Sequence, residues 1–177
     1  MAVPSQNTFD MSDFAGNWQL DPARTSIEFH TKALWLVPTK GTFPALEGVG
    51  TVAADGAISG TVIIDAASVD TKHKKRDVHL RMADFLDVEQ FPTITYEATS
   101  GSLGGPGTIE LHGILTVRGK SRPLTVSAYF RSARNAVTLW AEVDIDRSAW
   151  GLTSTSFGAG LKNRVFVRTQ FDKLAQR

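Results

Sequence analysis

The sequence predicts an all-β protein, an antiparallel barrel of about eight strands with a short helical segment inserted. Three observations favour this: apolar and polar residues alternate in many segments, turn residues separate these segments, and one stretch has helical spacing. Alternation with a period of two is typical of half-buried strands, because successive side chains point to opposite faces of a sheet. A meander with one apolar face must pack on a second sheet or close on itself, and closure leaves no exposed edge. We therefore expect a closed barrel.

The predicted strands follow one another from near Trp18 to the end of the chain. In an early strand, Ile27 and Phe29 point to one face and their polar neighbours to the other. The clearest strand lies at residues 137–145, where apolar side chains occupy every second position. The same alternation occurs at residues 93–98, 109–117 and 124–130. Turn residues separate the segments at 38–41, 54–56, 102–107, 117–120 and 134–135, which indicates short connections and a meander.

One segment departs from this alternation and predicts a helix or two helical turns. Within residues 73–89, the apolar residues Val78, Met82, Phe85 and Leu86 recur at helical spacing, with charged residues between them. A Phe-Pro pair then ends the stretch, because proline does not continue a helix. We expect the apolar stripe to lie over one end of the barrel and to cap a cavity there.

Length and composition indicate a single domain. The 177 residues suffice for a substantial core, and 42% hydrophobic and 21% charged residues are close to the averages for soluble globular proteins. Residues 1–16 are polar and aperiodic, which predicts a flexible lead-in. We expect residues 17–177 to form the barrel domain.

Charge and cysteine content exclude several classes of partner and chemistry. A formal charge of +1 gives no field that would attract nucleic acid, so no nucleic-acid partner is expected. The absence of cysteine excludes disulfides, thiol nucleophiles and thiolate metal sites. The first ten residues show neither a signal peptide nor a transmembrane segment. This predicts a cytoplasmic protein, or a periplasmic or secreted one if a leader has been trimmed.

No catalytic or metal-binding pattern is found in the sequence. No serine lies in a nucleophile elbow, and the four histidines are too scattered for a zinc motif or a facial triad. We therefore expect no catalytic residues, no metal and no cofactor. The polar cluster at 76–81 has two interpretations: a surface helix with an Asp77–Arg81 ion pair, or a polar cap that binds a ligand head group.

Several segments, in order, resemble the YceI-like family of lipocalin-like, polyisoprenoid-binding proteins. The most specific is the Arg-Asp-x-His-Leu motif at 76–80, followed by the Asp-Phe and Phe-Pro-Thr segments at 83–88 and 91–96. The other matching segments are 18–22, 26–29, 41–43, 46–48, 64–71, 113–119 and 145–152. The resemblance implies a lipocalin-like barrel whose apolar interior holds a polyisoprenoid or isoprenoid-quinone chain, with no established catalytic residues.

Two departures from the family pattern affect what the resemblance implies. Many relatives carry a signal peptide, which this chain does not show. Trp150 stands where the family often has Phe, and Trp35 adds bulk early in the barrel. We expect either residue to shorten the cavity or to change the preferred ligand.

The predicted ligand contacts are the apolar-face residues of the strands and the polar cluster near one end. They are Ile27, Phe29, Phe43, Val62, Ile64, Arg76, Asp77, His79, Phe85, Ile94, Tyr96, Leu115, Val126, Phe130, Leu139, Val143 and Ile145. Two alternatives stay open. One is a packed barrel that acts as a stress-related protein-interaction module. The other is an enzyme on a hydrophobic substrate, with His79 as acid or base and Asp77 orienting it. An exposed Trp140 would suit a homodimer contact.

Overall fold

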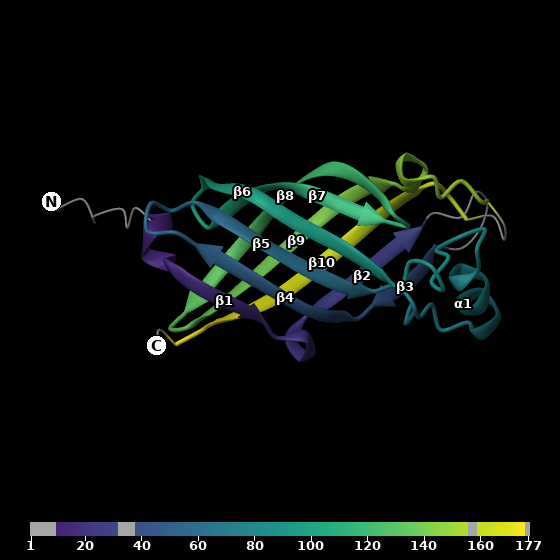
Figure 1. Ribbon diagram of the computed structural model, residues 1–177, viewed down its shortest axis with the longest axis horizontal. Coiled ribbons are helices and arrows are strands. Elements are labelled where there is room, and N and C mark those ends of the chain that lie inside the picture. Colours follow the sequence, from purple (N-terminus) through teal and green to yellow (C-terminus); the bar gives the residue numbers. More distant parts are fainter. Residues whose placement is uncertain (1–9, 32–37, 156–158, 176–177) are drawn as a thin grey trace, which may run out of the picture.

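The protein is a closed antiparallel β-barrel, seen in a computed structural model that describes residues 10–31, 38–155 and 159–175 (Figure 1). Its described strands form one sheet in the order β1-β4-β5-β6-β7-β8-β9-β10-β2-β3, and an additional β1–β10 pairing closes the ring. The strands are β1 Gly16–Leu20, β2 Ser26–Thr31, β3 Thr39–Phe43, β4 Ala45–Val52, β5 Ile58–Asp65, β6 Thr93–Gly105, β7 Thr108–Val117, β8 Lys120–Ala133, β9 Ala136–Asp146 and β10 Lys162–Lys173.

The ten described strand segments make an eight-stranded barrel because two sides are interrupted. The start of β10 pairs with β2 and its end pairs with β1, so β1 and β2 share one side of the ring. The turn η2 Pro22–Arg24 separates them, and Pro44 separates β3 from β4. Proline has no N–H to donate to a strand ladder, which accounts for breaks at these positions. The prediction of a closed barrel of about eight strands is confirmed.

Tight turns join neighbouring strands at several predicted positions, but residues 39–41 of the turn predicted at 38–41 belong to β3, and residues 102–105 of the turn predicted at 102–107 belong to β6. Arg118 and Gly119 connect β7 to β8 with positive φ angles of 48° and 69°. Two successive positive φ angles are the conformation of a type I′ hairpin, whose twist matches that of the flanking strands. The last residue of β7 pairs directly with the first residue of β8, so the two-residue turn fixes the register of the two strands.

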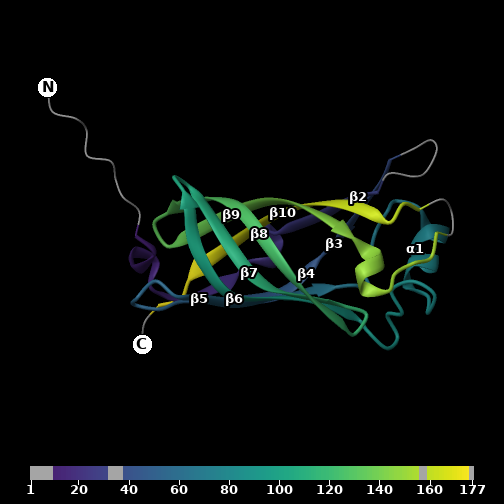
Figure 2. The same ribbon diagram turned by 90° about the horizontal axis from the view of Figure 1, so that it is seen from above.

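The two ends of the barrel are covered by different elements (Figures 1 and 2). Helix α1 Lys74–Arg81 lies at one end, and the short turn η1 Met11–Phe14 lies at the other. The turn η1 falls within the segment predicted to be a flexible lead-in, yet the indole Nε1 of Trp18 donates a 3.0 Å hydrogen bond to the carbonyl of Phe14. Within the described residues, no helix is long and apolar enough to cross a membrane.

The predicted apolar stripe of the helical segment is only half correct. Phe85 and Leu86 are buried, but Val78 and Met82 are 59% and 53% exposed. The helix ends at Arg81, and the following residues continue in turns, so the helical period does not extend to Phe85 and Leu86. A polar residue, Asp77, is the buried one within α1.

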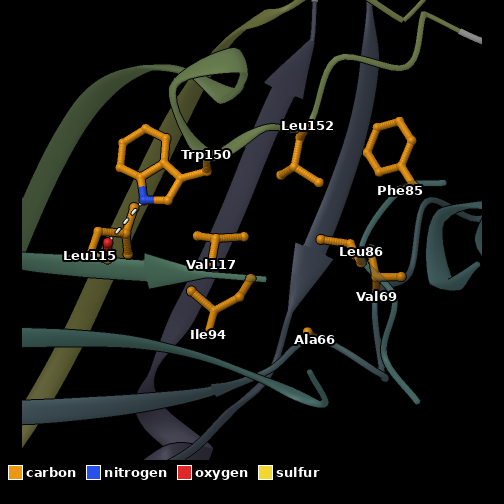
Figure 3. Close-up of a cluster of buried hydrophobic side chains, with 9 residues drawn as sticks. All are labelled: Ala66, Val69, Phe85, Leu86, Ile94, Leu115, Val117, Trp150 and Leu152. Carbon is orange, nitrogen blue, oxygen red and sulfur yellow. Dashed lines mark hydrogen bonds between the residues drawn. The ribbon is translucent and has the colours of Figure 1, made fainter. Parts of the chain in front are cut away.

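A packed apolar cluster lies at the α1 end of the barrel (Figure 3). Its members come from β6, β7 and the segments that follow β5, α1 and β9: Ala66, Val69, Phe85, Leu86, Ile94, Leu115, Val117, Trp150 and Leu152. The indole of Trp150 donates a 2.9 Å hydrogen bond to the carbonyl of Leu115. Burial of each large side chain here stabilises the fold by about 1.5–3 kcal/mol. Trp35 lies outside the described residues.

Trp140 on the outer face of β9 is half-buried rather than exposed. Its partners across the neighbouring strands are Tyr129, which is 70% exposed, and Arg168. Flanking side chains on both sides therefore cover part of the indole. The homodimer contact expected at Trp140 stays a prediction.

Candidate ligand-binding cavity

The middle of the barrel is hollow and almost entirely apolar. A cavity of about 260 Å³, here named the barrel cavity, extends from η1 to Ile145 near the end of β9 and Val165 near the start of β10. The alternation of the strands explains its character, because every second side chain points inward. The predicted contact residues on its wall are Ile27, Val62, Ile64, Tyr96, Leu115, Val126, Phe130, Leu139, Val143 and Ile145.

A glycine on β4 contributes to the space in the barrel cavity. Gly50 lies on the cavity wall and pairs with Gly60 of β5. A Cβ atom added to Gly50 would approach no heavy atom closer than 3.8 Å, so the missing side chain leaves open volume. The sequence alone favours bulges or bends for glycines in this segment, because periodicity does not reveal which face has room.

A second, smaller cavity of about 170 Å³ lies at the α1 end, here named the end cavity. It shares Ile145 and Val165 with the barrel cavity, so the two lie next to each other along β9 and β10. Predicted contacts on its wall are Phe29, Phe43, Arg76, His79, Phe85, Ile94 and Ile145. All predicted contact residues except Asp77 thus line one of the two cavities, and their contact with a ligand stays a prediction.

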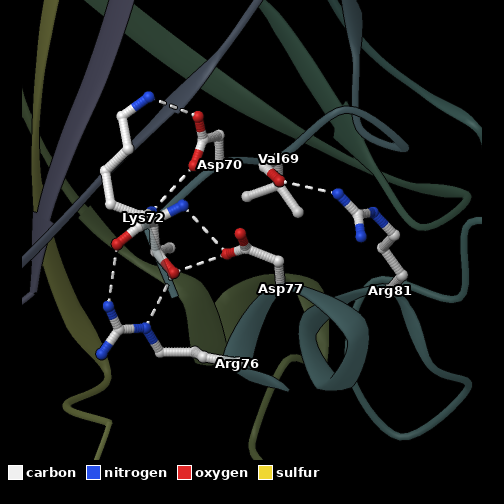
Figure 4. A network of polar contacts seen from close by, with 7 residues as sticks. Val69, Asp70, Lys72, Arg76, Asp77 and Arg81 are labelled. Atoms are coloured by element: carbon white, nitrogen blue, oxygen red, sulfur yellow. Dashed lines mark hydrogen bonds and ion pairs between the residues drawn. The ribbon is translucent and has the colours of Figure 1, made fainter. Parts of the chain in front are cut away.

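Asp77 holds the chain in place beside the end cavity rather than lining it (Figure 4). Its Oδ1 accepts hydrogen bonds from the backbone N and the hydroxyl of Thr71, at 2.9 and 2.5 Å. Arg76 donates from Nε to the Thr71 hydroxyl and from Nη2 to the Thr71 carbonyl, at 2.8 and 3.0 Å. Arg81 instead donates to the carbonyls of Ala67 and Val69. Because both side chains have these other partners, the predicted Asp77–Arg81 pair is replaced by bonds to neighbouring segments.

His79 has a different carboxylate neighbour from the one that the enzymatic alternative requires. Its Nε2 lies 3.4 Å from Oδ2 of Asp84, and its ring centroid is 6.4 Å from that of Phe85. The carboxylate of Asp77 is bound to Thr71. The structure therefore does not place Asp77 where it would orient His79 as the enzymatic alternative requires.

The most buried charge on the wall of the end cavity is Arg147, which the sequence analysis missed. Its side chain is 6% exposed and lies in the turn η3 Arg147–Trp150. The guanidinium carbon is 4.8 Å from the centre of the Phe85 ring, a cation–π distance. Four hydrogen bonds fix the group: to the carbonyls of Gly160 at 3.0 Å, Ser154 at 2.6 Å, Ala159 at 3.1 Å and Leu152.

Burial lowers the pKa of Arg147, but an arginine side chain stays protonated in proteins, so the wall of the end cavity carries a positive charge.

The sequence contains a pattern that predicts the inward direction of Arg147. Val143, Ile145 and Arg147 occupy every second position, so continuing the alternation of β9 by one step points Arg147 inward.

Tyr96 is a polar residue of the barrel cavity wall whose hydroxyl binds backbone groups. Its hydroxyl lies 3.3 Å from the carbonyl of Leu111 and 3.1 Å from that of Leu124, so it donates to backbone within the wall. Burial raises the pKa of Tyr96, which keeps the phenol neutral. The barrel cavity therefore offers packing and no charged group to a ligand.

Comparisons with known protein sequences match most of the barrel. The model of the YceI-like domain family matches residues 18–172. A UPF0312 protein of Ectopseudomonas mendocina is 39% identical over 103 residues, which cover 57% of this chain and 52% of the relative. A UPF0312 protein of Vibrio cholerae is 34% identical over 113 residues, covering 63% and 60%. The chain thus spans between about half and three fifths of these relatives.

Solved structures share the architecture. BcnA from Burkholderia cenocepacia has a TM-score of 0.74 at 23% identity, covering 85% of this chain and 98% of BcnA. A polyisoprenoid binding domain from Saccharophagus degradans, implicated in plant cell wall breakdown, has a TM-score of 0.72 at 12% identity, covering 89% and 98%. At these identities the likeness shows a common fold.

Proposed function

We propose that this chain, which belongs to the YceI-like family, binds a long apolar isoprenoid-type lipid inside its barrel. The ligand class is a polyisoprenoid or an isoprenoid quinone, and binding serves its carriage, storage or sensing. The observation that carries the proposal is the apolar barrel cavity, beside which the end cavity lies. The barrel cavity, at about 260 Å³, is close to the roughly 300 Å³ at which drug-sized sites begin, and the neighbouring end cavity has a further 170 Å³ or so.

The energetics favour an apolar chain as the occupant. Each Å² of apolar surface that leaves water contributes about 25 cal/mol before the costs of binding are counted. The wall of the barrel cavity offers no charged group that would select a polar ligand. A solved domain of the same fold is described as polyisoprenoid binding, which supports the same ligand class for this chain.

The test is native mass spectrometry of the purified protein, with organic extraction and identification of any released lipid. We expect a stoichiometric isoprenoid or quinone. A mass equal to the bare chain, unchanged after incubation with isoprenoids of several lengths, would contradict the proposal.

A cavity-filling variant tests where the lipid lies. Ala141→Phe adds an apolar ring to the wall of the barrel cavity and should abolish binding while the barrel still folds. Leu139→Asp places a charge in the same cavity and should have the same effect. Thr138→Asp is the matched control, because Thr138 precedes Leu139 on β9, faces outward and pairs with Arg131. Unchanged binding in a folded Ala141→Phe protein would count against a ligand in the barrel.

Of the alternatives, the interaction module requires an interior without room for a ligand. The described residues enclose two cavities, so this feature does not support it. A cytoplasmic location and a homodimer stay predictions, which fractionation and size-exclusion chromatography would check.

A further inference from the structure

The charges on the wall of the end cavity are of one sign. Among the described residues that line it, Arg76 and Arg147 are cations and His79 is titratable, and none is an aspartate or a glutamate. The described ion pairs of the chain include neither Arg76 nor Arg147. The cavity is therefore positively charged without a carboxylate bound to either guanidinium.

Nearby carboxylates have other partners. Asp77 accepts from Thr71. Asp146, next to Arg147 in sequence, accepts from the backbone and the hydroxyl of Ser148, at 3.0 and 2.6 Å. Asp84 contacts His79 at 3.4 Å. These contacts hold the acidic groups in positions where none forms an ion pair with Arg76 or Arg147.

Both guanidinium groups retain donor capacity. An arginine has five N–H groups. The hydrogen bonds of Arg147 to four carbonyls use four of them, and those of Arg76 to Thr71 use two. The bonds also fix each group in orientation, so an incoming acceptor meets donors that lose little conformational freedom on binding.

A buried cation that no carboxylate contacts directly favours an anionic partner over a neutral one. Burial of a charge is costly unless it is paired, and hydrogen bonds between two ionised groups are about twice as strong as neutral ones. A quinone carbonyl or an alcohol accepts a hydrogen bond but brings no charge. An ionised carboxylate or phosphate supplies both acceptor oxygens and the missing negative charge.

Size and position fit a head group attached to an apolar tail. The volume of about 170 Å³ holds several water molecules at about 30 Å³ each, enough for a carboxylate or a phosphate. Ile145 and Val165, which the two cavities share, lie where a chain would pass from one to the other. Phe29 and Phe43, with ring centroids 5.2 Å apart, line the apolar side of the end cavity.

We propose that the end cavity binds the ionised acidic head group of the lipid, a carboxylate or a phosphate, through Arg147 and Arg76. The tail then extends through the barrel cavity toward η1. This inference rests on the proposed lipid binding and narrows it to acidic amphiphiles.

Three probes with one tail separate the head groups: geranylgeraniol, geranylgeranoic acid and geranylgeranyl monophosphate. Dissociation constants are measured by titration of the intact protein at neutral pH. We expect at least one anionic probe to bind about tenfold or more tightly than the alcohol. The comparison of the acid with the phosphate identifies which anion the cavity accepts.

Matched variants test the two arginines. Arg76→Gln should remove most of the advantage that the anionic probe has over geranylgeraniol. Arg147→Lys keeps the charge but loses the planar donor set, and should weaken the anionic probe selectively. Arg164→Gln is the control, because it removes an equal charge from the outer face of β10, where Arg164 pairs with Glu142 and Asp144.

The outcomes distinguish this inference from the proposed function. Equal affinity for all three probes, or an anionic advantage that Arg76→Gln leaves intact, overturns the acidic head group while lipid binding stands. Failure of every probe, including longer-tailed alcohols, overturns both. If Arg147→Lys does not fold, Arg76→Gln and the loss of the anionic advantage at high salt decide the matter.

Discussion

The barrel cavity and the end cavity adjoin each other but are built differently. The wall of the barrel cavity consists mainly of regular strands, held by backbone ladders, and its side chains follow the period of two. Around the end cavity, α1, η3 and the segments between strands supply much of the wall. These are fixed by side chains such as Asp77 and Arg147 that bind backbone groups. Regular strand pairing thus gives the barrel cavity a uniform apolar wall, whereas the irregular segments give the end cavity its polar groups.

The largest effect is expected from Asp77→Ala, which tests whether side-chain bonds hold the α1 end. The change leaves the buried N–H and hydroxyl of Thr71 without their acceptor. We expect the free energy of unfolding to fall by about 3 kcal/mol, measured by urea denaturation.

Asp70→Ala is the control for this change, since the Asp70 carboxylate is exposed and binds Lys72. It should lower the free energy of unfolding much less than Asp77→Ala does, because an exposed ion pair contributes little to stability. Equal losses in the two variants would show that Asp77 has no special part in fixing this end.

A smaller effect is expected at the opposite end of the barrel cavity, where η1 closes it. The Phe14 ring lines the cavity and meets the Phe130 ring edge-on at 5.7 Å. Phe14→Ala should lower the free energy of unfolding by about 1 kcal/mol and shift lipid preference toward longer chains. Titration with isoprenoids of increasing length measures this shift. Met11→Leu, a change of similar volume in the same turn, should leave the preference as it is.

The smallest effect concerns the outer surface, which takes part in neither cavity. Arg164 donates to the Asp144 carboxylate and lowers its pKa from the usual 3.8. A lowered folded-state pKa stabilises the fold above the unfolded value, and this contribution is lost as the pH falls through the folded value. Arg164→Gln should therefore lower the melting temperature slightly at neutral pH and not at about pH 2.

Arg168→Gln provides the comparison for the pH experiment. Arg168 lies on the same outer face of β10 and donates to the backbone carbonyl of Arg24, 3.2 Å away. Its replacement should have an effect that does not change with the ionisation of Asp144. A pH-independent loss in Arg164→Gln would mean that packing, and not the ion pair, explains its contribution.

Some features follow from local sequence. Alternation predicts β9 and the inward direction of Leu139 and Val143, because side-chain direction in a strand depends on position alone. Turn residues predict the hairpin at Arg118 and Gly119 through their backbone conformation. The ordered motifs indicate the YceI-like family, which the match over residues 18–172 confirms.

Other features depend on how distant segments meet. Val78 and Met82 are exposed, while Asp77 is buried because Thr71 offers it two donors. Arg147 becomes a cavity residue through the carbonyls of the segment between η3 and β10. No local sequence pattern predicts these hydrogen-bond partners, because they lie in other segments of the chain.

The sequence by itself thus determined strands such as β9, the turn at Arg118 and Gly119, the closed barrel and the family. Only the tertiary structure decided which part of the interior is filled and which is hollow. The physical reason is that alternation tells which side chains point inward but not how far apart the opposing walls lie. Around Trp150 the side chains of opposing walls pack against one another. At Gly50 the wall of the barrel cavity has no side chain that could fill the space between the walls.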